Sequence, residues 1–417
     1  MKQDETDVLV LGAGIVGVAA ALHLQQRGRD VVLVDRNAAA GDETSYGNAG
    51  LIEVASVFPY MFPRDLGHLL RYALNRSADV HYQLSGLPEF MPWLLRYFAA
   101  SSPERAANTA RAALPLIRQS LVEHEALVAE AGVPELLRKT GWIKLFRSEA
   151  SLGKSVADLE RARSFGVTAD VLDGASIAAR EPNLMGRFSG AIHWLEPGFV
   201  PDPGALVKAY AALFARKGGR LLRGDARTLQ QHGGGWRITT DTGPVTAREA
   251  VVALGPWSDL VFKPLGYRIP LGVKRGYHQH FTTWGNAVLQ HPILDADRGY
   301  LLAPMNRGIR LTTGAEFARR DAPPSSVQID RARAMARDLF PLGEAIEPQA
   351  WMGARPCLPD MLPVIGRAPR HPGLWFDFGH QHHGLTLGPV TGRLLAEMMT
   401  GQDPLANPAP FAAERFG

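Results

Sequence analysis

A glycine-rich turn between two apolar segments restricts the fold of this chain more than any other part of the sequence. The run DVLVLG predicts a buried strand, VAAALHLQQRG predicts a helix, and VVLVD predicts a second buried strand. Gly12, Gly14 and Gly17 form the pattern GxGxxG where the first strand meets the helix. The missing side chains let the backbone and the positive helix end approach a pyrophosphate. We therefore expect a Rossmann-type βαβ unit that binds a dinucleotide.

The acid at the end of the second strand narrows the choice of dinucleotide. Asp35 follows Gly17 by 18 residues, where a carboxylate can accept hydrogen bonds from an adenosine ribose. An acid at this place disfavours a phosphorylated ribose, so FAD or NAD is expected rather than NADP. A segment of small and polar residues follows, and its alternative interpretation is an ordinary loop. If this segment covers the pyrophosphate and reaches the isoalloxazine ring, it favours FAD over NAD. Its residues are Thr44, Ser45, Gly47, Asn48, Ala49 and Gly50.

Composition excludes several other classes of protein. The 417 residues, 46% of them hydrophobic, are enough for two or three domains with buried cores. The 45 basic and 41 acidic residues are mixed along the chain, which argues against a nucleic-acid-binding surface. Cys357 is the single cysteine, so no internal disulfide can form. The opening MKQDETDVLVLG lacks the pattern of a signal peptide, and we expect a cytoplasmic protein.

No stretch of about 20 apolar residues, the length a membrane-spanning helix needs, occurs in the sequence. Residues 58–74 and 87–100 are rich in aromatic residues, leucine and arginine. Such segments either pack over a substrate site or lie on a membrane surface as amphipathic helices. Peripheral contact with the inner face of a membrane is therefore one of two interpretations.

The pattern of elements predicts a mixed α/β fold with a cofactor domain and a substrate domain. Residues 101–132 have helical periodicity, although Pro115 should kink or divide the helix. Residues 269–313 are typical of antiparallel strands, and the tail returns to cofactor-like signals. The cofactor domain is expected from residues 1–57, 149–260 and 348–417, and the substrate domain from residues 58–148, with the helical insertion, and 261–347.

An ordered series of motifs resembles the D-amino-acid oxidase (DAO) superfamily, and within it the bacterial D-amino-acid dehydrogenases. The motifs are VLGAGIVGVAAALHL, TSYGNAGLI, KTGWIKLFRS, VVALGPWS, VKRGY, GARPCLPDMLPVIG and GHQHHGLTLGPVTGRLLAEMMTG. The resemblance implies a fold of the DAO and glutathione-reductase-2 type, in which a Rossmann-like FAD domain lies under an antiparallel sheet.

The resemblance also implies an activity in amino acid catabolism. A D-amino acid or cyclic imino acid would lose hydride from its α-carbon to flavin N5, and a quinone or other acceptor would then take the electrons. Arg355, in GARPCLPD, would bind the substrate carboxylate, and Tyr300 would assist it. An ion-paired surface arginine and a core tyrosine are the alternatives. His382 departs from the D-alanine-preferring pattern and either contacts the substrate or has a packing role.

Further cofactor contacts follow from the same resemblance. The GHQHHG loop would pass beside the flavin, and the helix that follows would place positive charge near the pyrimidine end. Because Cys357 does not match the covalent attachment position of some relatives, FAD is expected to be noncovalent. No metal site is expected from His380, His382 and His383. The implied contacts, besides those named above, are Ile15, Val16, Arg36, Leu51, Ala226, Gly255, Trp257, Gly353, His380, His383, Gly384, Leu385 and Thr386.

Two further functions are compatible with these motifs. One is an oxygen-using amine oxidase for glycine, sarcosine or hydroxyproline, and the other is a flavoprotein subunit that works only within a hetero-oligomeric dehydrogenase. A plain NAD dehydrogenase is disfavoured, because it would have no use for the GHQHHG loop or the VVALGPWS strand. In every remaining case the expected partner is a small-molecule amine and the expected cofactor is FAD.

Overall fold

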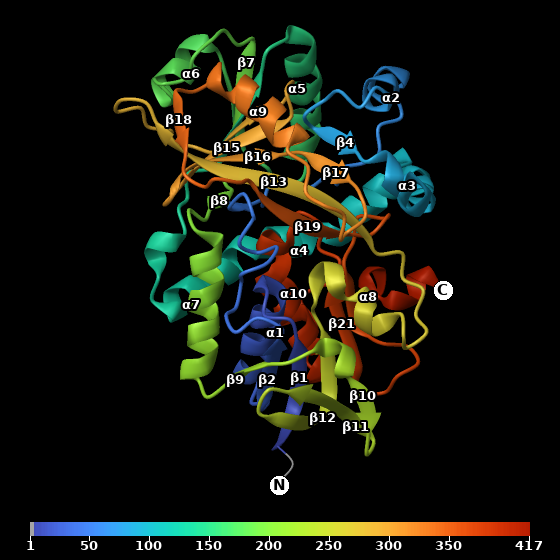
Figure 1. Cartoon of the computed structure of the whole chain (residues 1–417). Helices are drawn as coiled ribbons and strands as arrows, with labels where there is room; N and C mark the ends of the chain where they lie inside the picture. The colour runs from blue at the N-terminus through green and yellow to red at the C-terminus, as the bar shows by residue number, and fades with distance from the viewer. Residues whose placement is uncertain (1–3) are drawn as a thin grey trace.

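A parallel sheet forms the centre of the lower domain in the computed structural model, which describes residues 4–417 (Figure 1). Its central strands contain apolar runs that are buried on both faces of the sheet: residues 8–11, 31–34, 250–252 and 374–376. The parallel strands are, in spatial order, β9 (Arg220–Arg223), β2 (Val31–Asp35), β1 (Asp4–Leu11), β12 (Gly243–Val252) and β21 (Leu374–Phe378). Antiparallel strands extend the sheet: β11 (Gly235–Thr240), β10 (Gln230–His232) and β20 (Val364–Arg367).

Helices from distant parts of the chain cover one face of this sheet. They are α1 (Ile15–Gln26), α4 (Pro103–Ala131), α7 (Pro203–Arg216) and α10 (Gly384–Met399). The first and the last of them pack directly together. Their backbones approach closely at Gly392, where a Cβ atom would lie 2.7 Å from the Ala20 nitrogen. The cofactor domain therefore closes only when both ends of the chain are present.

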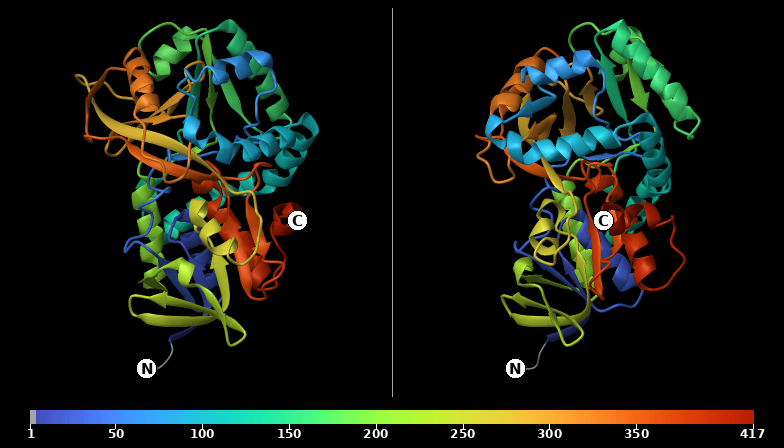
Figure 2. Two further views of the ribbon diagram at one scale, coloured as in Figure 1. Left: turned by 45° about the vertical axis from the view of Figure 1, so that its right-hand side comes forward. Right: turned by 90° about the vertical axis from the view of Figure 1, so that its right-hand side faces the viewer.

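The upper domain is built on an eleven-strand, mostly antiparallel sheet of the described chain (Figure 2). Nine strands follow the order β4 (Val80–Tyr82), β17 (Ala315–Phe317), β13 (Gly272–Thr283), β16 (Gly308–Thr313), β15 (Tyr300–Met305), β14 (Ile293–Asp295), β5 (Trp142–Phe146), β7 (Gly190–Trp194) and β6 (Ala169–Leu172). The long strand β13 also pairs with β18 (Leu342–Ala345) and β19 (Trp351–Cys357). In Figure 1, β13 and β19 lie across the boundary between the two domains.

Smaller elements complete the upper domain and its junction with the lower one. Helix α9 (Val327–Arg337) packs against β16, on the outer face of the sheet. The short strands β3 (Leu51–Ile52) and β8 (Gly198–Phe199) pair at the junction. The other helices are α2 (Leu66–Ala73), α3 (Leu87–Ala100), α5 (Glu149–Arg163), α6 (Gly174–Arg180) and α8 (Asp259–Phe262).

Sheet membership corrects the expected domain boundaries in three places. Strands β6 and β7 belong to the upper sheet, although residues 149–260 were expected in the cofactor domain. Strand β19 also belongs to the upper sheet instead of the final cofactor segment. Helix α4, expected in the substrate domain, packs against α10 and α7 of the cofactor domain. The first three residues of the segment 1–57 lie outside the described residues.

Helix α4 also differs from its predicted form, because it runs for 29 residues without division at Pro115. Pro115 is exposed, so the backbone carbonyl that it leaves without a helical partner can bond to water. Among residues 4–417, no helix combines the length and the apolar character needed to cross a bilayer.

Candidate cofactor and substrate site

One continuous cavity of about 2010 Å³ runs from the glycine-rich turn before α1 to strands β13 and β19. Small-molecule pockets commonly measure about 300–1,000 Å³, so this cavity has room for a large cofactor together with a substrate. Every residue predicted to contact the cofactor lines it except Gly17 and Gly50. Gly17 packs against Gly12 and Gly50 packs against Val200 and Phe199, outside the cavity lining.

Close packing explains the three glycines of the turn. Gly12 has a φ of +105°, and a Cβ atom there would lie 2.5 Å from the Ala253 carbonyl oxygen. At Gly17 a Cβ atom would lie 1.8 Å from the Gly12 oxygen. Gly14 precedes α1 without a side-chain cap of its own, and the Ile15 N–H instead donates to the Ser45 Oγ at 3.0 Å. The exposed helix end can therefore receive a phosphate oxygen.

Asp35 lies at the carboxyl end of β2, at the edge of the cavity. Its Oδ2 accepts from the Ala13 N–H at 2.7 Å, and its Oδ1 accepts from the Asn37 N–H at 2.8 Å. Each carboxylate oxygen has a second lone pair left for a ribose hydroxyl. Nearby, the Arg36 guanidinium lies 4.0 Å from the centre of the Trp257 ring, and Ala226 and Gly255 line the same region.

The small-residue segment after Asp35 is held rigidly against the upper sheet. Thr44 donates to the Ala354 carbonyl at 2.8 Å, and a Cβ atom on Gly47 would lie 1.7 Å from the Trp351 ring. The buried Arg310 donates to the backbone carbonyls of Tyr46, at 3.1 Å, and of Asn48. This segment is therefore an ordered wall of the cavity and not a free loop.

The loop that leads into α10 forms the opposite wall. Gln381 has a φ of +58°, and its N–H donates to the Pro356 carbonyl at 2.8 Å. Such backbone strain in a non-glycine residue is typical of functional sites. The Thr386 hydroxyl donates to the Leu51 carbonyl at 3.2 Å and accepts from the Glu53 N–H at 3.1 Å. The positive end of α10 is thereby directed at the cavity.

The three histidines of this loop have different surroundings. The His380 ring lies in the core, 3.0 Å from the Thr391 hydroxyl and 3.4 Å from Asp377. The His382 ring lies 3.9 Å from the His383 ring and 4.9 Å from the Tyr60 ring. Burial and the neighbouring cations lower the pKa of His382 well below its usual value, so this ring is neutral. No three potential metal ligands converge anywhere in the described residues.

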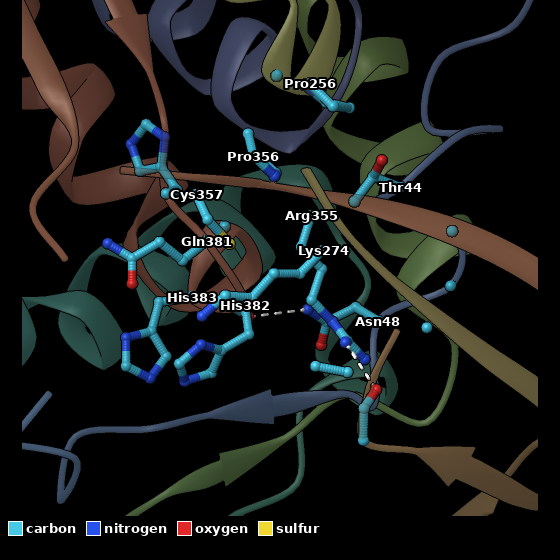
Figure 3. A pocket seen from close by; sticks show the side chains of 18 of the residues that line it. Thr44, Asn48, Pro256, Lys274, Arg355, Pro356, Cys357, Gln381, His382 and His383 are labelled. Carbon is cyan, nitrogen blue, oxygen red and sulfur yellow. Dashed lines mark hydrogen bonds between the residues drawn. The ribbon is translucent and has the colours of Figure 1, made fainter. Parts of the chain in front are cut away.

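Arg355 lies at the far end of the cavity on β19, opposite Lys274 of β13 (Figure 3). Its guanidinium covers Gly276, where a Cβ atom would come within 2.4 Å of Nη2. Its Nη1 donates to the Gly314 carbonyl at 2.9 Å. Within residues 4–417 it has no carboxylate partner, so the alternative of an ion-paired arginine is excluded. The remaining guanidinium donors are available to a ligand.

Tyr300 forms its hydrogen bonds in the core of the upper domain. Its hydroxyl donates to the Asp295 carboxylate at 3.3 Å and to the Met335 carbonyl at 3.2 Å, in the core beneath α9. The next residue along β15, Leu301, packs instead with Leu51 from the cofactor side. Because side chains alternate across a strand, Tyr300 and Arg355 serve different faces of the sheet. Tyr300 lines the cavity, but its hydroxyl is directed away from Arg355, and its role in binding the substrate carboxylate stays a prediction.

Lys274 and Glu53 are ionisable residues of the cavity that the sequence did not single out. Lys274 lies within VKRGY, in a strand with several other charged and polar residues, so its charge alone gave no distinct signal. Glu53 follows the apolar pair LI of β3, and burial raises its pKa to about 7. Its carboxylate lies 4.0 Å from His383 Nε2. Nothing in the local sequence indicates that these two side chains would face the same cavity.

These walls fit a flavin dinucleotide. The turn before α1 leaves the space and the N–H groups for a pyrophosphate, and Asp35 has acceptors for a ribose. The cavity continues beyond them past Asn48 and the start of α10 to Arg355. A flavin ring would therefore lie between the dinucleotide-binding turn and the upper sheet.

Comparisons with known proteins agree with this geometry. A "D-amino-acid oxidase" of Bradyrhizobium diazoefficiens is 31% identical, with 98% of each chain covered. A "D-amino acid dehydrogenase" of Chromohalobacter salexigens is 29% identical over 98% of this chain and 99% of its own. The structure of glycine oxidase from Geobacillus kaustophilus matches with a TM-score of 0.75 at 23% identity, covering 99% of both chains.

L-proline dehydrogenase from P. horikoshii has the same fold, with a TM-score of 0.75 at 17% identity over 99% of this chain and 98% of its own. The family described as "FAD dependent oxidoreductase" (DAO) matches residues 7–398. Because that match covers nearly the whole chain, the protein belongs to the DAO family of FAD-dependent oxidoreductases.

Proposed function

We propose that this protein catalyses the oxidative deamination of a D-amino acid or a cyclic imino acid. The observation that carries the proposal is Arg355, a buried guanidinium without a protein counter-ion at the end of the flavin cavity. A guanidinium fork makes paired, charge-assisted hydrogen bonds to a carboxylate. The names of the curated relatives, D-amino-acid oxidase and D-amino acid dehydrogenase, support the same substrate class.

The residues of the cavity bind, orient and desolvate the substrate. Arg355 holds the α-carboxylate, which fixes the α-carbon relative to the flavin. His382 is neutral and can donate a hydrogen bond to the carboxylate or to a polar group of the substrate. The buried walls exclude water from this end of the cavity. A bound FAD would supply the acceptor for the hydride of the α-carbon, and the imine product would hydrolyse to a 2-oxo acid and ammonia or persist if it is cyclic.

FAD is proposed to bind noncovalently. Burial raises the pKa of the Cys357 thiol, the only thiol in the chain, so the reactive thiolate is disfavoured. Acid precipitation should leave a colourless pellet and a yellow supernatant. A yellow pellet would contradict noncovalent binding.

The test is anaerobic mixing of the purified yellow protein with D-amino acids, their L-enantiomers, glycine, sarcosine and hydroxyproline isomers. Loss of flavin absorbance with D-isomers only is expected. Bleaching by glycine or sarcosine alone would favour the amine oxidase alternative. A flavin that no compound reduces, unless a copurified partner is added, would favour the hetero-oligomeric subunit.

We propose further that a membrane quinone receives the electrons. Leu66 and Leu70 of helix α2 and Leu74 directly after it are exposed to the extent of 71%, 59% and 64%. Their spacing of four residues places them on one helix face, and exposed arginines, Arg64 and Arg76, flank that face. An apolar face with basic flanks is typical of a helix that lies on an anionic lipid surface.

Cosedimentation with anionic vesicles at low salt tests the membrane contact. The wild-type protein should pellet with the vesicles, and a variant with Leu66, Leu70 and Leu74 all changed to Gln should remain in solution. Admission of air after anaerobic reduction tests the acceptor separately. Slow reoxidation by oxygen and fast reoxidation by a soluble quinone are expected, and the reverse order would show an oxidase.

A further inference from the structure

Lys274 is a second cation at the Arg355 end of the cavity, and the proposed deamination does not use it. On one face of β13, Gly272 is covered by the Trp93 indole and Gly276 by the Arg355 guanidinium, with hypothetical Cβ contacts of 2.5 and 2.4 Å. Lys274 projects between these two groups, since alternate residues of a strand share a face. It lies directly opposite Arg355 in the β13–β19 ladder.

Aromatic rings and no carboxylate surround the Lys274 ammonium. Its Nζ lies 4.2 Å from the centre of the Tyr97 ring, 5.0 Å from that of Trp93 and 5.7 Å from that of Phe317. Within the described part of the chain, no acceptor or acid lies at bonding distance from Nζ. Burial lowers the pKa of the Lys274 ammonium, Arg355 lowers it further and a Cys357 thiolate would raise it, so a bound carboxylate would favour the charged form. Burial raises the pKa of that thiol, so Cys357 provides no compensating negative charge near neutral pH.

This end of the cavity therefore holds two basic side chains and no protein anion. Removing a charge from water without a partner is costly, and the aromatic rings compensate only part of that cost. The α-carboxylate of a neutral amino acid would pair with Arg355 and leave Lys274 unpaired. We propose that the substrate carries a second carboxylate, which binds to Lys274, so that the enzyme prefers acidic amino acids such as D-glutamate or D-aspartate.

The geometry is suited to a short diacid. Strand residues rise about 3.3 Å each, so Gly276, beneath the Arg355 guanidinium, lies about 7 Å along β13 from Lys274. His382 lies beside both cations in Figure 3, and its pKa is lowered in part by them. The neutral His382 ring can thus contact a bound diacid without adding a third positive charge.

The proposal rests on the proposed function for turnover, and its binding step can be measured without turnover. Holoenzyme is titrated with the unreactive diacids succinate and glutarate and with the monoacids butyrate and valerate, and flavin absorbance is followed. The diacids should bind at least about tenfold more tightly, the effect of one charge-assisted hydrogen bond. Equal affinities would overturn the proposal without any need for a variant.

Anaerobic reduction compares isosteric pairs, D-glutamate with D-glutamine and D-aspartate with D-asparagine. The acids should be preferred, and Lys274→Met should lower the ratio of kcat/KM for acid over amide at least about tenfold. Lys139→Met, at an exposed lysine, is the matched control and should keep the ratio. FAD content and circular dichroism show whether Lys274→Met is folded, and Lys274→Arg should restore part of the preference.

The two proposals fail in different ways. Reduction by neutral D-amino acids with no preference for acids would refute the role of Lys274 and leave deamination supported. Diacid binding that depends on Lys274, with no reduction by any amino acid, would refute deamination and retain the diacid site. A ratio unchanged in Lys274→Met would refute the assignment of the second carboxylate to this residue.

Discussion

Arg355 owes its proposed role to its neighbours as much as to its charge. The peptide carbonyl of Gly314 fixes one side of the guanidinium, and Gly276 provides the flat surface on which it lies. A side chain at residue 276 would displace it. The arginine is therefore oriented before a substrate arrives, which reduces the entropy lost on binding.

Arg355→Ala should weaken substrate binding far more than it slows the reduction of bound substrate. Each lost charge-assisted hydrogen bond is worth about 1.5–3 kcal/mol, so KM should rise on the order of 100-fold. Arg355→Lys should recover only part of this loss, since an ammonium cannot make the paired contact. The substrate dependence of anaerobic flavin reduction measures both values, and an unchanged KM would show that the carboxylate binds elsewhere.

Glu53 should give the flavin spectrum a pH dependence. Burial raises its pKa to about 7, and it lies in the same cavity wall as Thr386. Loss of its proton would change the electric field beside the bound flavin, so the visible spectrum should shift with a midpoint near pH 7. Glu53→Gln should abolish this transition. The control Glu160→Gln, at an exposed carboxylate, should retain the spectral transition. If Glu53→Gln also retained a midpoint near pH 7, the transition would belong to another group.

Site residues could be predicted where a short sequence motif determines their positions. They could not be predicted where contacts between distant segments determine which side chains face the cavity. Gly12, Gly14 and Asp35 were found because their spacing alone places them at one turn. The direction of the Tyr300 hydroxyl, toward Asp295 and away from Arg355, could not be read from the sequence, because a one-residue shift moves a side chain to the other face of a strand. Lys274 and Glu53 became visible only when separate segments were brought together around the cavity.

At the scale of elements, helix α1 and its turn form a tightly fitted unit. Gly17→Ala would place a methyl group 1.8 Å from the Gly12 carbonyl oxygen, which forces the turn and the helix apart. We expect the affinity for FAD to fall at least about tenfold, with little loss of secondary structure. The ratio of the flavin absorbance to the absorbance at 280 nm, measured after dialysis, gives the fraction of protein that retains FAD.

Gly153→Ala is the matched control for this substitution. Gly153 lies within α5, and a Cβ atom there would meet nothing within 4 Å. Alanine is favoured over glycine inside a helix, so this variant should keep its FAD and its stability. Equal FAD retention in both variants would show that the turn tolerates a side chain.

The elements themselves were largely predictable, but their assignment to domains was not. The apolar runs of β1 and β2, the helical periodicity of α4 and the strand pattern of residues 269–313 are local signals, and the structure confirms them. Membership of β6, β7 and β19 in the upper sheet depends on pairing with distant strands, mainly β5 and β13. Strand pairing is set by packing with remote neighbours, which local propensity does not report.

At the scale of the whole molecule, buried histidines should make the fold sensitive to mild acid. Burial lowers the pKa of His124 and of His383 to about 4 and that of His278 to about 2. Below pH 6.5 the unfolded chain therefore binds more protons than the folded one, and stability falls as pH falls. Each of these groups should remove about 2 kcal/mol between pH 7.5 and pH 5.

Glu53 opposes this trend, because its raised pKa makes the folded state bind the extra proton between pH 7 and pH 4.5. Three histidines outweigh one carboxyl, so the melting temperature of the holoenzyme should be lower at pH 5 than at pH 7.5. Thermal unfolding followed by flavin fluorescence measures the difference. His124→Gln should be less stable at pH 7.5 and less sensitive to pH, and a melting temperature that is equal or higher at pH 5 would contradict the prediction.

The contact between α1 and α10 has a consequence for how the protein is made. These helices come from opposite ends of the chain, and Gly392 fits against Ala20 with almost no space to spare. During synthesis on a ribosome, the glycine-rich turn emerges long before the helix that completes its surroundings. Since contacts between distant segments form late, the nascent chain should remain open, without tight flavin binding, until residues 384–399 have left the exit tunnel. Capture of the flavin is thereby delayed until α10 has been made, after nearly all of the substrate chamber.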